Sequence, residues 1–299
     1  MQNLREKIKD FTIYLIFLAF VNFMRLLGID KASYLAASIM RIFGPWTKAG
    51  QIVRNNLRYV YTNITKEELK LLEQEIWDNF GRYLGEFAYL DEKYQKSENR
   101  VYISGIEIID ELKSKGKNFI LFSGHFANWD YVLRDALKIV GECGVVYRKV
   151  NNKYIDKYLH KRRSVNGAHL IQKGPDSGLK IARLIKEKKN LLMLVDQKMN
   201  QGVRVKLMDR PANTATGPAM LALRYSYNLV PVKITRVKGR AEFALEFLEP
   251  LVIQTSHDPE TDIVNLTIKM NDFLTIWIKE NPGLWLWQHQ RWGKPHEML

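Results

Sequence analysis

The chain has 299 residues, of which 46% are hydrophobic and 26% are charged, so it can bury a substantial core and is not a disordered chain. Its single cysteine, Cys143, excludes an intramolecular disulfide framework, and no Cys-His cluster has the spacing of a zinc site. The formal net charge of +14 indicates an anionic partner, which could be nucleic acid, an anionic membrane surface or a phosphorylated substrate.

Nucleic acid is the least supported of these partners. The sequence has no RNP-like aromatic string, no zinc-finger spacing and no basic leucine zipper. We therefore expect no nucleic-acid partner and look to lipid or phosphorylated small molecules for the negative charge.

An uncharged apolar run lies near the N-terminus, from Phe11 to Met24 (FTIYLIFLAFVNFM). It is short of the ~20 residues that a spanning helix needs, and Lys and Arg residues flank it on both sides. No signal-peptide cleavage pattern follows it. We predict a membrane anchor over residues 1–30, inserted in the bilayer or lying on it, with a buried core helix as the alternative.

The next segment is helical by pattern. Thr65 and Glu68 form a capping box, and apolar residues then recur at steps of three or four as far as Phe87. This periodicity predicts a long amphipathic helix within a leading helical segment, residues 31–95, of one domain that extends from residue 31 to residue 299.

From about residue 100, short apolar runs alternate with helical patterns. Buried strands are expected at 118–123, 144–147, 191–195 and 229–234, a further strand at 241–251, and helices near 127–140, 152–163, 177–188, 217–227 and 263–277. This alternation predicts an α/β fold with a mostly parallel central sheet flanked by helices. In such sheets the functional groups gather at the carboxyl ends of the strands.

One histidine stands at such a strand end. In LFSGHFANWD, His125 follows a predicted strand and a glycine, and Asp130 comes five positions later. The His-x4-acid spacing occurs again at His257 and Asp262, but that pair lies in a polar loop whose aspartate resembles a helix cap. The strand context therefore favours His125 over His257.

Helix geometry constrains the His125–Asp130 pair. Five positions along a helix turn about 140° around its axis, so the side chains meet only if His125 lies in a loop and Asp130 in the first turns of the following helix. A carboxylate so placed would fix one imidazole tautomer and make His125 a general base for a hydroxyl nucleophile. The alternative is a buried, satisfied histidine beside a helix-start aspartate.

Other catalytic templates are missing from the sequence. Ser123 has no G-x-S-x-G context, and there is no H-E-x-x-H, G-x-x-x-x-G-K-[ST] or G-x-G-x-x-G motif. We expect neither a metal nor another cofactor.

Several basic residues are placed where they could hold an anion. Arg148 follows the strand at 144–147, and Lys161, Arg162 and Arg163 end the next predicted helix. A guanidinium group suits phosphate or carboxylate, although cations at a helix end also complement the helix dipole. Asp196, at the end of the strand at 191–195, is a further candidate site residue.

The C-terminal stretch NPGLWLWQHQRWGKP is unusually rich in tryptophan. Trp285 and Trp287 are expected to be structural, because tryptophans at this density are usually core or membrane-interface residues. Arg291 is a candidate anion contact.

Taken in order, these segments resemble the bacterial late acyltransferases of lipid A biosynthesis, the lauroyl and myristoyl transferases, within the wider His-x4-acid lysophospholipid acyltransferase group. The resemblance covers nearly the whole chain. The matching segments are the apolar N-terminus, GHFANWD, VVYRKVNNKYIDKYLHKRRS, LLMLVDQ, PANTATGPAMLALRYS, LVPVKITR and PGLWLWQHQRW.

The resemblance implies transfer of a fatty acyl chain from acyl carrier protein to a hydroxyl of a lipid A precursor at the cytoplasmic face of the inner membrane. It implies that His125 is the general base and Asp130 its acidic partner. Arg163, with Arg162 as the alternative alignment, matches the arginine after the central helix, and Asp196 matches the strand-end aspartate.

The chain departs from the family pattern at two places. Asp130 stands where most members have glutamate, and LMDRPANTATG replaces an aromatic-glycine element. Two alternatives stay open at this point: a lysophospholipid or ornithine-lipid acyltransferase, and a non-catalytic membrane-anchored protein that binds anionic lipid or nucleic acid.

Overall fold

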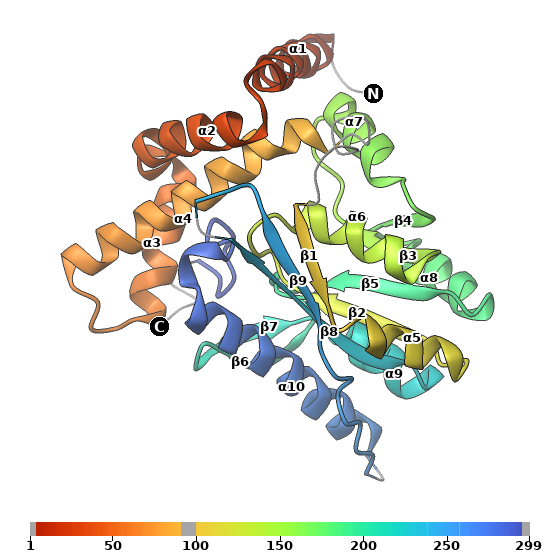
Figure 1. Ribbon diagram of the computed structural model, residues 1–299. Coiled ribbons are helices and arrows are strands. Elements are labelled where there is room, and N and C mark those ends of the chain that lie inside the picture. Colours follow the sequence, from red (N-terminus) through yellow and green to blue (C-terminus); the bar gives the residue numbers. More distant parts are fainter. Residues whose placement is uncertain (1–3, 91–99, 238, 257, 295–299) are drawn as a thin grey trace.

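The structure is a computed structural model that describes residues 4–90, 100–237, 239–256 and 258–294. Its centre is a seven-stranded sheet with the order β1-β9-β8-β2-β5-β3-β4 (Figure 1). The strands are β1 (Val101–Ser104), β2 (Phe119–Ser123), β3 (Cys143–Tyr147), β4 (Ala168–Gln172), β5 (Asn190–Leu194), β8 (Asn228–Arg236) and β9 (Phe243–Phe247). Neighbouring strands are parallel except β8 and β9, so the predicted mostly parallel sheet is confirmed.

Helices cover both faces of this sheet. They are α5 (Ile106–Ser114), α6 (Trp129–Val140), α7 (Lys153–Arg163), α8 (Ser177–Lys186), α9 (Gly217–Tyr225) and α10 (Pro259–Glu280). Alternate side chains of β2 point to opposite faces, as a strand requires. Phe119 and Leu121 pack with residues of α5, α6 and α7, whereas Ile120 and Phe122 pack with residues of α8, α9 and α10. The sheet therefore separates two hydrophobic layers.

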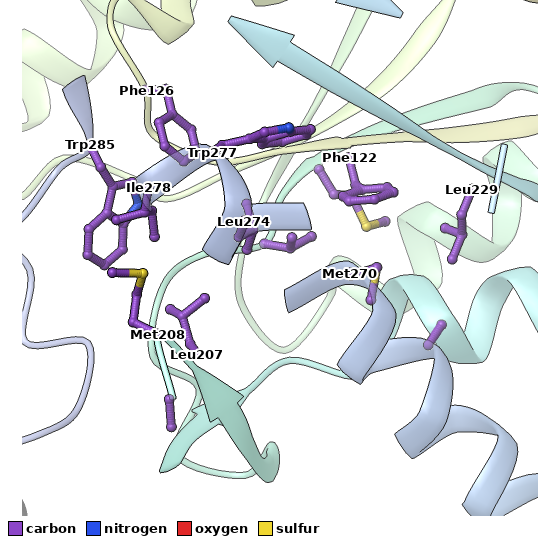
Figure 2. Packing of buried hydrophobic residues seen from close by; sticks show 14 of the residues in the cluster. Phe122, Phe126, Leu207, Met208, Leu229, Met270, Leu274, Trp277, Ile278 and Trp285 are labelled. Carbon is purple, nitrogen blue, oxygen red and sulfur yellow. The ribbon is translucent and has the colours of Figure 1, made fainter. Parts of the chain in front are cut away.

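The layer beneath the end of β2 is formed largely by α10. Met270, Leu274 and Ile278 are fully buried and lie one helical turn apart, on the face of α10 that meets Phe122 and Phe126 (Figure 2). Because these side chains recur at steps of four, one stripe of the helix supplies the support. The helix begins after Asp258, whose side chain accepts from the backbone N–H of Glu260, so Asp262 is not the N-terminal cap that the sequence suggested.

The N-terminal part of the chain is helical. It contains α1 (Leu4–Leu27), α2 (Ile29–Phe43), η1 (Gly44–Trp46), α3 (Lys48–Val60), α4 (Lys66–Glu86) and η2 (Phe87–Tyr89), gathered at one end of the sheet (Figure 1). The predicted capping box of α4 is confirmed: Thr65 Oγ1 accepts from the Glu68 N–H at 3.1 Å, and the Glu68 carboxylate accepts from the Thr65 N–H at 2.9 Å. The last turns of α4 reach the carboxyl ends of the strands.

A small hairpin and a final turn complete the described chain. The hairpin pairs β6 (Val203–Leu207) with β7 (Arg210–Thr214), and the turn is η4 (Pro282–Leu284). Helix α1 is the one helix in the described chain whose length and composition would allow it to cross a membrane. The proposed division at residue 30 into an anchor and a single domain stays a prediction.

Candidate active site

His125 lies in a tight loop between β2 and α6. Its backbone N–H donates to Asp196 at 2.8 Å, and its carbonyl accepts from the Leu286 N–H at 3.0 Å. Ala127 has a left-handed conformation with a φ of 46°, and its N–H donates to the carbonyl of Leu284 at 2.8 Å. The loop is thus held on one side by the end of β5 and on the other by the tryptophan-rich C-terminal segment.

The carboxylate that contacts the His125 ring belongs to Asp196. Strand β5 pairs with β2 in a register that aligns Leu194 with Ser123, so the residues two positions further, Asp196 and His125, are level. Nδ1 of His125 lies 2.7 Å from Oδ1 of Asp196. The second oxygen, Oδ2, accepts from the backbone N–H of His125 and from Nε1–H of Trp285, each at 2.8 Å.

The electrostatic state of this pair follows from its partners. Asp196 is almost completely buried, and burial alone would raise its pKa, but the neighbouring His125 and the N–H donors outweigh burial and hold the pKa well below its usual range. An ionised Asp196 accepts a hydrogen bond from Nδ1–H, which leaves Nε2 as the unprotonated, basic nitrogen. The Gln197 side-chain amide lies 3.4 Å from Nε2.

Asp130 has different partners from those the spacing suggested. It sits in the first turn of α6, where the loop-to-helix argument requires it, yet its carboxylate accepts from Arg163 at 2.8 and 3.1 Å and from the Tyr83 hydroxyl at 2.7 Å. The predicted hydrogen bond between Asp130 and His125 is therefore wrong, because the carboxylate that accepts from the His125 ring is that of Asp196. The physical reason is that Asp196 comes from an adjacent strand, whereas α6 carries Asp130 away from the imidazole.

The Asp130 cluster is buried and strongly coupled. Burial lowers the pKa of Arg163, but the Asp130 carboxylate beside it more than compensates and raises that pKa overall. Burial, reinforced by Asp130, raises the pKa of Tyr83 well above its usual value. Trp129 stacks on Tyr83 at 4.0 Å between ring centroids and meets the His125 ring edge to face at 5.1 Å, so it connects this cluster to the His125–Asp196 pair.

A cavity of about 780 Å³ opens beside His125. Its lining includes His125, Arg148, Arg163, Lys173 and Gln197, and much of the remaining lining is apolar. The apolar residues come mainly from α8, α9 and the sheet floor: Val146, Ile181, Ala182, Ile185, Met193, Val195, Met220, Leu221 and Tyr225. Among the described residues that line it there is no Asp or Glu, so the wall carries only positive charge.

Two of the remaining predicted site residues do not reach this cavity. The guanidinium of Arg162 lies 3.2 Å from the centre of the Tyr158 ring and donates to the Tyr158 carbonyl. Arg291 is completely buried, where it donates to the carbonyl of Asn213 at 2.8 Å and to Thr214 Oγ1 at 2.6 Å, and burial lowers its pKa to about 10. The expected anion contact of Arg291 is therefore corrected to a structural link, because its side chain has no exposed surface.

The second His-x4-acid pair also has a structural explanation. His257 lies outside the described residues. Both carboxylate oxygens of Asp262 accept from the backbone N–H of Ser256 at 2.9 Å, which closes the loop before α10. In the described part of the chain, no group of three or more His, Cys, Asp or Glu side chains could hold a metal ion.

The sequence did not point to three residues at this site. Tyr83 belongs to the apolar stripe of α4, Lys173 follows a strand too polar to be recognised, and Trp285 was expected to be structural only. The one available signal was the tryptophan density near the C-terminus, because a buried indole N–H needs an acceptor.

The family model described as bacterial lipid A biosynthesis acyltransferase matches residues 3–294. This range contains all the residues of the cavity wall and of the His125–Asp196 pair. No curated protein matches the chain.

Proposed function

Because the chain belongs to the bacterial lipid A biosynthesis acyltransferase family, we propose that it moves a fatty acyl chain from acyl carrier protein to a hydroxyl group of a lipid A precursor. The observation that carries this proposal is the 2.7 Å contact between His125 Nδ1 and Asp196 at the rim of an apolar-walled cavity. A base beside an apolar cavity is what transfer of a long acyl chain to an alcohol requires.

His125 is the general base in this mechanism. Nδ1–H donates a hydrogen bond to Asp196. Nε2 is then free to take the proton of the acceptor hydroxyl while the hydroxyl oxygen attacks the thioester carbonyl. The tetrahedral intermediate collapses when its C–S bond breaks, and the departing thiolate of the carrier receives the proton from Nε2. No acyl-enzyme is needed, because the thioester is already activated. The bonds and the proton of the proposed step balance with donor, acceptor and His125 alone.

Arg163 is the residue to which we assign stabilisation of the oxyanion. It lines the same cavity as His125, and Asp130 holds its guanidinium through two hydrogen bonds. A cation fixed in this way costs little reorganisation when negative charge develops on the carbonyl oxygen. Asp130 is then a positioning residue for Arg163 rather than the partner of His125.

We assign the acyl chain to the part of the cavity between α8 and α9, called here the α8–α9 groove. Ile181, Ile185 and Leu221 line it from opposite sides, and Met193 of β5 forms part of its floor. Each buried methylene contributes about 0.8 kcal/mol, so such a groove favours a long chain. The groove starts beside the catalytic histidine, as a thioester whose carbonyl sits at His125 requires.

Two features of the protein support its association with a membrane. Helix α1 is apolar and mostly exposed, and the chain carries a net charge of +14. We place the protein at the cytoplasmic face of the inner membrane, because a basic surface suits both an acidic carrier protein and anionic lipid headgroups.

The test is mass spectrometry of lipid A from cells with the chain, without it, and with the variant His125→Ala. We expect an acyl group to be missing from lipid A in the last two. The variant His169→Ala is the matched control, because His169 is an exposed residue of β4 that does not line the cavity. Normal lipid A in cells that carry only His125→Ala would exclude the proposed base.

The same experiment separates the alternatives. A lysophospholipid or ornithine-lipid acyltransferase would leave lipid A unchanged and alter another lipid class. A non-catalytic binding protein would give the same lipids with His125→Ala as with the wild-type chain.

A further inference from the structure

Arg148 and Lys173 follow two neighbouring strand ends and both line the cavity. The last aligned residues of the parallel strands β3 and β4 are Tyr147 and Gln172, and the N–H of Lys173 donates to the carbonyl of Tyr147 at 2.8 Å. Arg148 and Lys173 are therefore the first residues beyond two neighbouring strand ends. Both line the cavity.

The positive charge of these two side chains is not neutralised within the described chain. Arg163 is paired with Asp130, but neither Arg148 nor Lys173 makes an ion pair with a described carboxylate, and no described acid lines the cavity. Partial burial lowers the pKa of Lys173, and the nearby charge of Arg148 lowers it further. Like charges in contact with one cavity are stabilised by an anion between them.

We propose that Arg148 and Lys173 form a phosphate-binding subsite at the edge of the acyl-transfer cavity. This inference rests on the proposed function, whose donor carries a phosphodiester in the prosthetic arm of the carrier and whose acceptor carries phosphate groups. The planar guanidinium fork and the ammonium group supply complementary donors for a tetrahedral phosphate. The subsite orients a phosphorylated substrate so that its reacting atoms meet His125.

The test compares kinetics of the wild-type chain with those of R148Q, K173Q and the double variant. We expect KM for the phosphate-bearing substrate to rise about tenfold per removed cation, with a smaller change in kcat. K180Q is the matched control, because Lys180 is an exposed cation of α8 that does not line the cavity.

Substrate analogues identify which phosphate is bound. If it belongs to the donor, the effect of the double variant disappears with an acyl-pantetheine donor that lacks the phosphate. If it belongs to the acceptor, the effect disappears with a dephosphorylated acceptor. An unchanged KM for all substrates overturns the subsite.

A direct measurement keeps this test separate from the proposed reaction. Titration calorimetry with inorganic phosphate should show binding to the wild-type chain and to K180Q, and none to the double variant. If acyl transfer fails but this difference is found, the subsite stands and the reaction does not. Equal phosphate binding by all chains overturns the subsite even if acyl transfer is observed.

A second and independent observation concerns the orientation of α1. One face of this helix contacts the rest of the protein along most of its length. Asn152, which caps α7, donates to the carbonyl of Asp10 at 2.7 Å, and Arg25 donates to the carbonyl of Ala88 at 2.9 Å. Between these ends, Tyr14 stacks on Tyr154 at 5.7 Å, Phe17 meets Tyr158 at 5.1 Å, and Val21 and Met24 are buried.

These contacts are incompatible with a helix that crosses the bilayer. From Asp10 to Arg25 the helix rises ~22 Å, which is most of the ~30 Å hydrocarbon thickness. Helix α7 would then lie in the hydrocarbon with its exposed Lys153, Lys157 and Lys161, and each central lysine costs several kcal/mol there.

We infer that α1 lies in the plane of the membrane interface, with its free face in the lipid. That face exposes Leu4, Ile8, Ile16, Phe23 and Leu26, while Arg5, Lys7 and Lys9 near the N-terminal end are exposed and suit anionic headgroups. The lipid bilayer is the occupant that this combination of apolar surface and flanking cations matches.

Membrane topology distinguishes the two orientations. Single cysteines are introduced as Lys7→Cys in α1 and Lys186→Cys in α8, and each is treated with an impermeant maleimide in spheroplasts and in inverted inner-membrane vesicles. Cys143 is buried with a raised pKa and gives no background. We expect both positions to react from the same side. Reaction from opposite sides overturns the in-plane orientation.

Discussion

At the scale of single residues, Asp196 is the organising group of the site. Its two oxygens accept hydrogen bonds from the His125 ring, the His125 backbone and the Trp285 indole. The carboxylate therefore fixes both the tautomer of the imidazole and the path of the loop that carries it.

The first prediction concerns the variant Asp196→Asn. An amide cannot stabilise the imidazolium and can favour the wrong tautomer, so kcat for acyl transfer should fall about a hundredfold or more. Trp285→Phe keeps the carboxylate and removes one donor, and should cost much less. Steady-state kinetics with a purified acyl carrier protein donor provide the measurement, and a kcat within twofold of wild type would contradict the pairing.

The second prediction separates Asp130 from Asp196. Asp130→Asn leaves Arg163 buried without its ion partner, so thermal unfolding should show a loss of about 3 kcal/mol together with a lower kcat. Tyr83→Phe removes only one hydrogen bond to Asp130 and should cost about 1 kcal/mol. Asp130→Glu keeps the negative charge, so its losses of stability and of kcat should both be smaller than those of Asp130→Asn. Unfolding of Asp130→Asn at the wild-type temperature would rule out this role.

The third prediction is a pH dependence of stability from His289. Burial lowers its pKa from 6.5 to about 4, and its Nε2 accepts from the Lys198 N–H at 2.8 Å. Below pH 6.5 His289 binds a proton in the unfolded chain but stays neutral in the folded chain. The free energy of unfolding should therefore fall between pH 6.5 and 4 by on the order of 3 kcal/mol. Denaturant titrations should give a flatter profile for His289→Gln, and parallel profiles would disprove the assignment.

At the scale of elements, the central strands could be predicted and the edge strands could not. Strand β2 is buried along its whole length and therefore reads as a continuous apolar run, and β5 and β8 do so nearly as well. The edge strands β1 and β4 are half exposed, and the hairpin β6–β7 lies outside the main sheet with a proline in β7. Mixed or polar sequences of this kind give no strand signal.

The sequence predicts His125 and Asp196 as site residues but not the contact between them. His125 and Asp196 were both recognised as strand-end residues. Their contact depends on β5 lying beside β2, although the two residues are 71 positions apart. Sequence spacing favoured the nearer Asp130, because strand order within a sheet leaves no local pattern. Lys173 was missed together with β4, the strand that positions it.

The fourth prediction concerns the groove between α8 and α9. Ala182→Phe adds bulk to the apolar wall and should shift donor preference to shorter acyl chains, lowering kcat/KM for long donors about tenfold or more, since each lost methylene contact is worth about 0.8 kcal/mol. Leu179→Phe is the control, because Leu179 is a strongly exposed residue of α8 outside the wall. Competition between acyl donors of different length measures the preference. An unchanged order of preference would mean that the acyl chain does not bind in the α8–α9 groove.

At the scale of the whole molecule, the positive charge and the cavity act together. In the proposed function, a net charge of +14 would attract an acidic carrier protein from a distance, and the cavity wall, which has no acid among its described residues, would continue that field toward His125. Long-range attraction of this kind affects encounter more than the chemical step.

The fifth prediction follows from this field. Raising the salt concentration from 0.05 to 0.5 M should lower kcat/KM for acyl carrier protein about tenfold, since the Debye length shrinks. The value for the small donor acyl-pantetheine should change little, which makes it the internal control. Equal salt dependence of both donors would mean that steering does not operate.

The apolar groove has one more consequence, which concerns the end of the reaction. In the proposed reaction, acyl transfer changes the bond at the carbonyl and leaves the hydrocarbon untouched, so an acyl chain bound in the α8–α9 groove would remain there after the carrier departs. Each methylene that favours donor binding also retains the finished lipid by the same ~0.8 kcal/mol. In the proposed reaction, product departure into the bilayer would therefore become slower as the acyl chain lengthens, so the groove would affect turnover as well as selectivity.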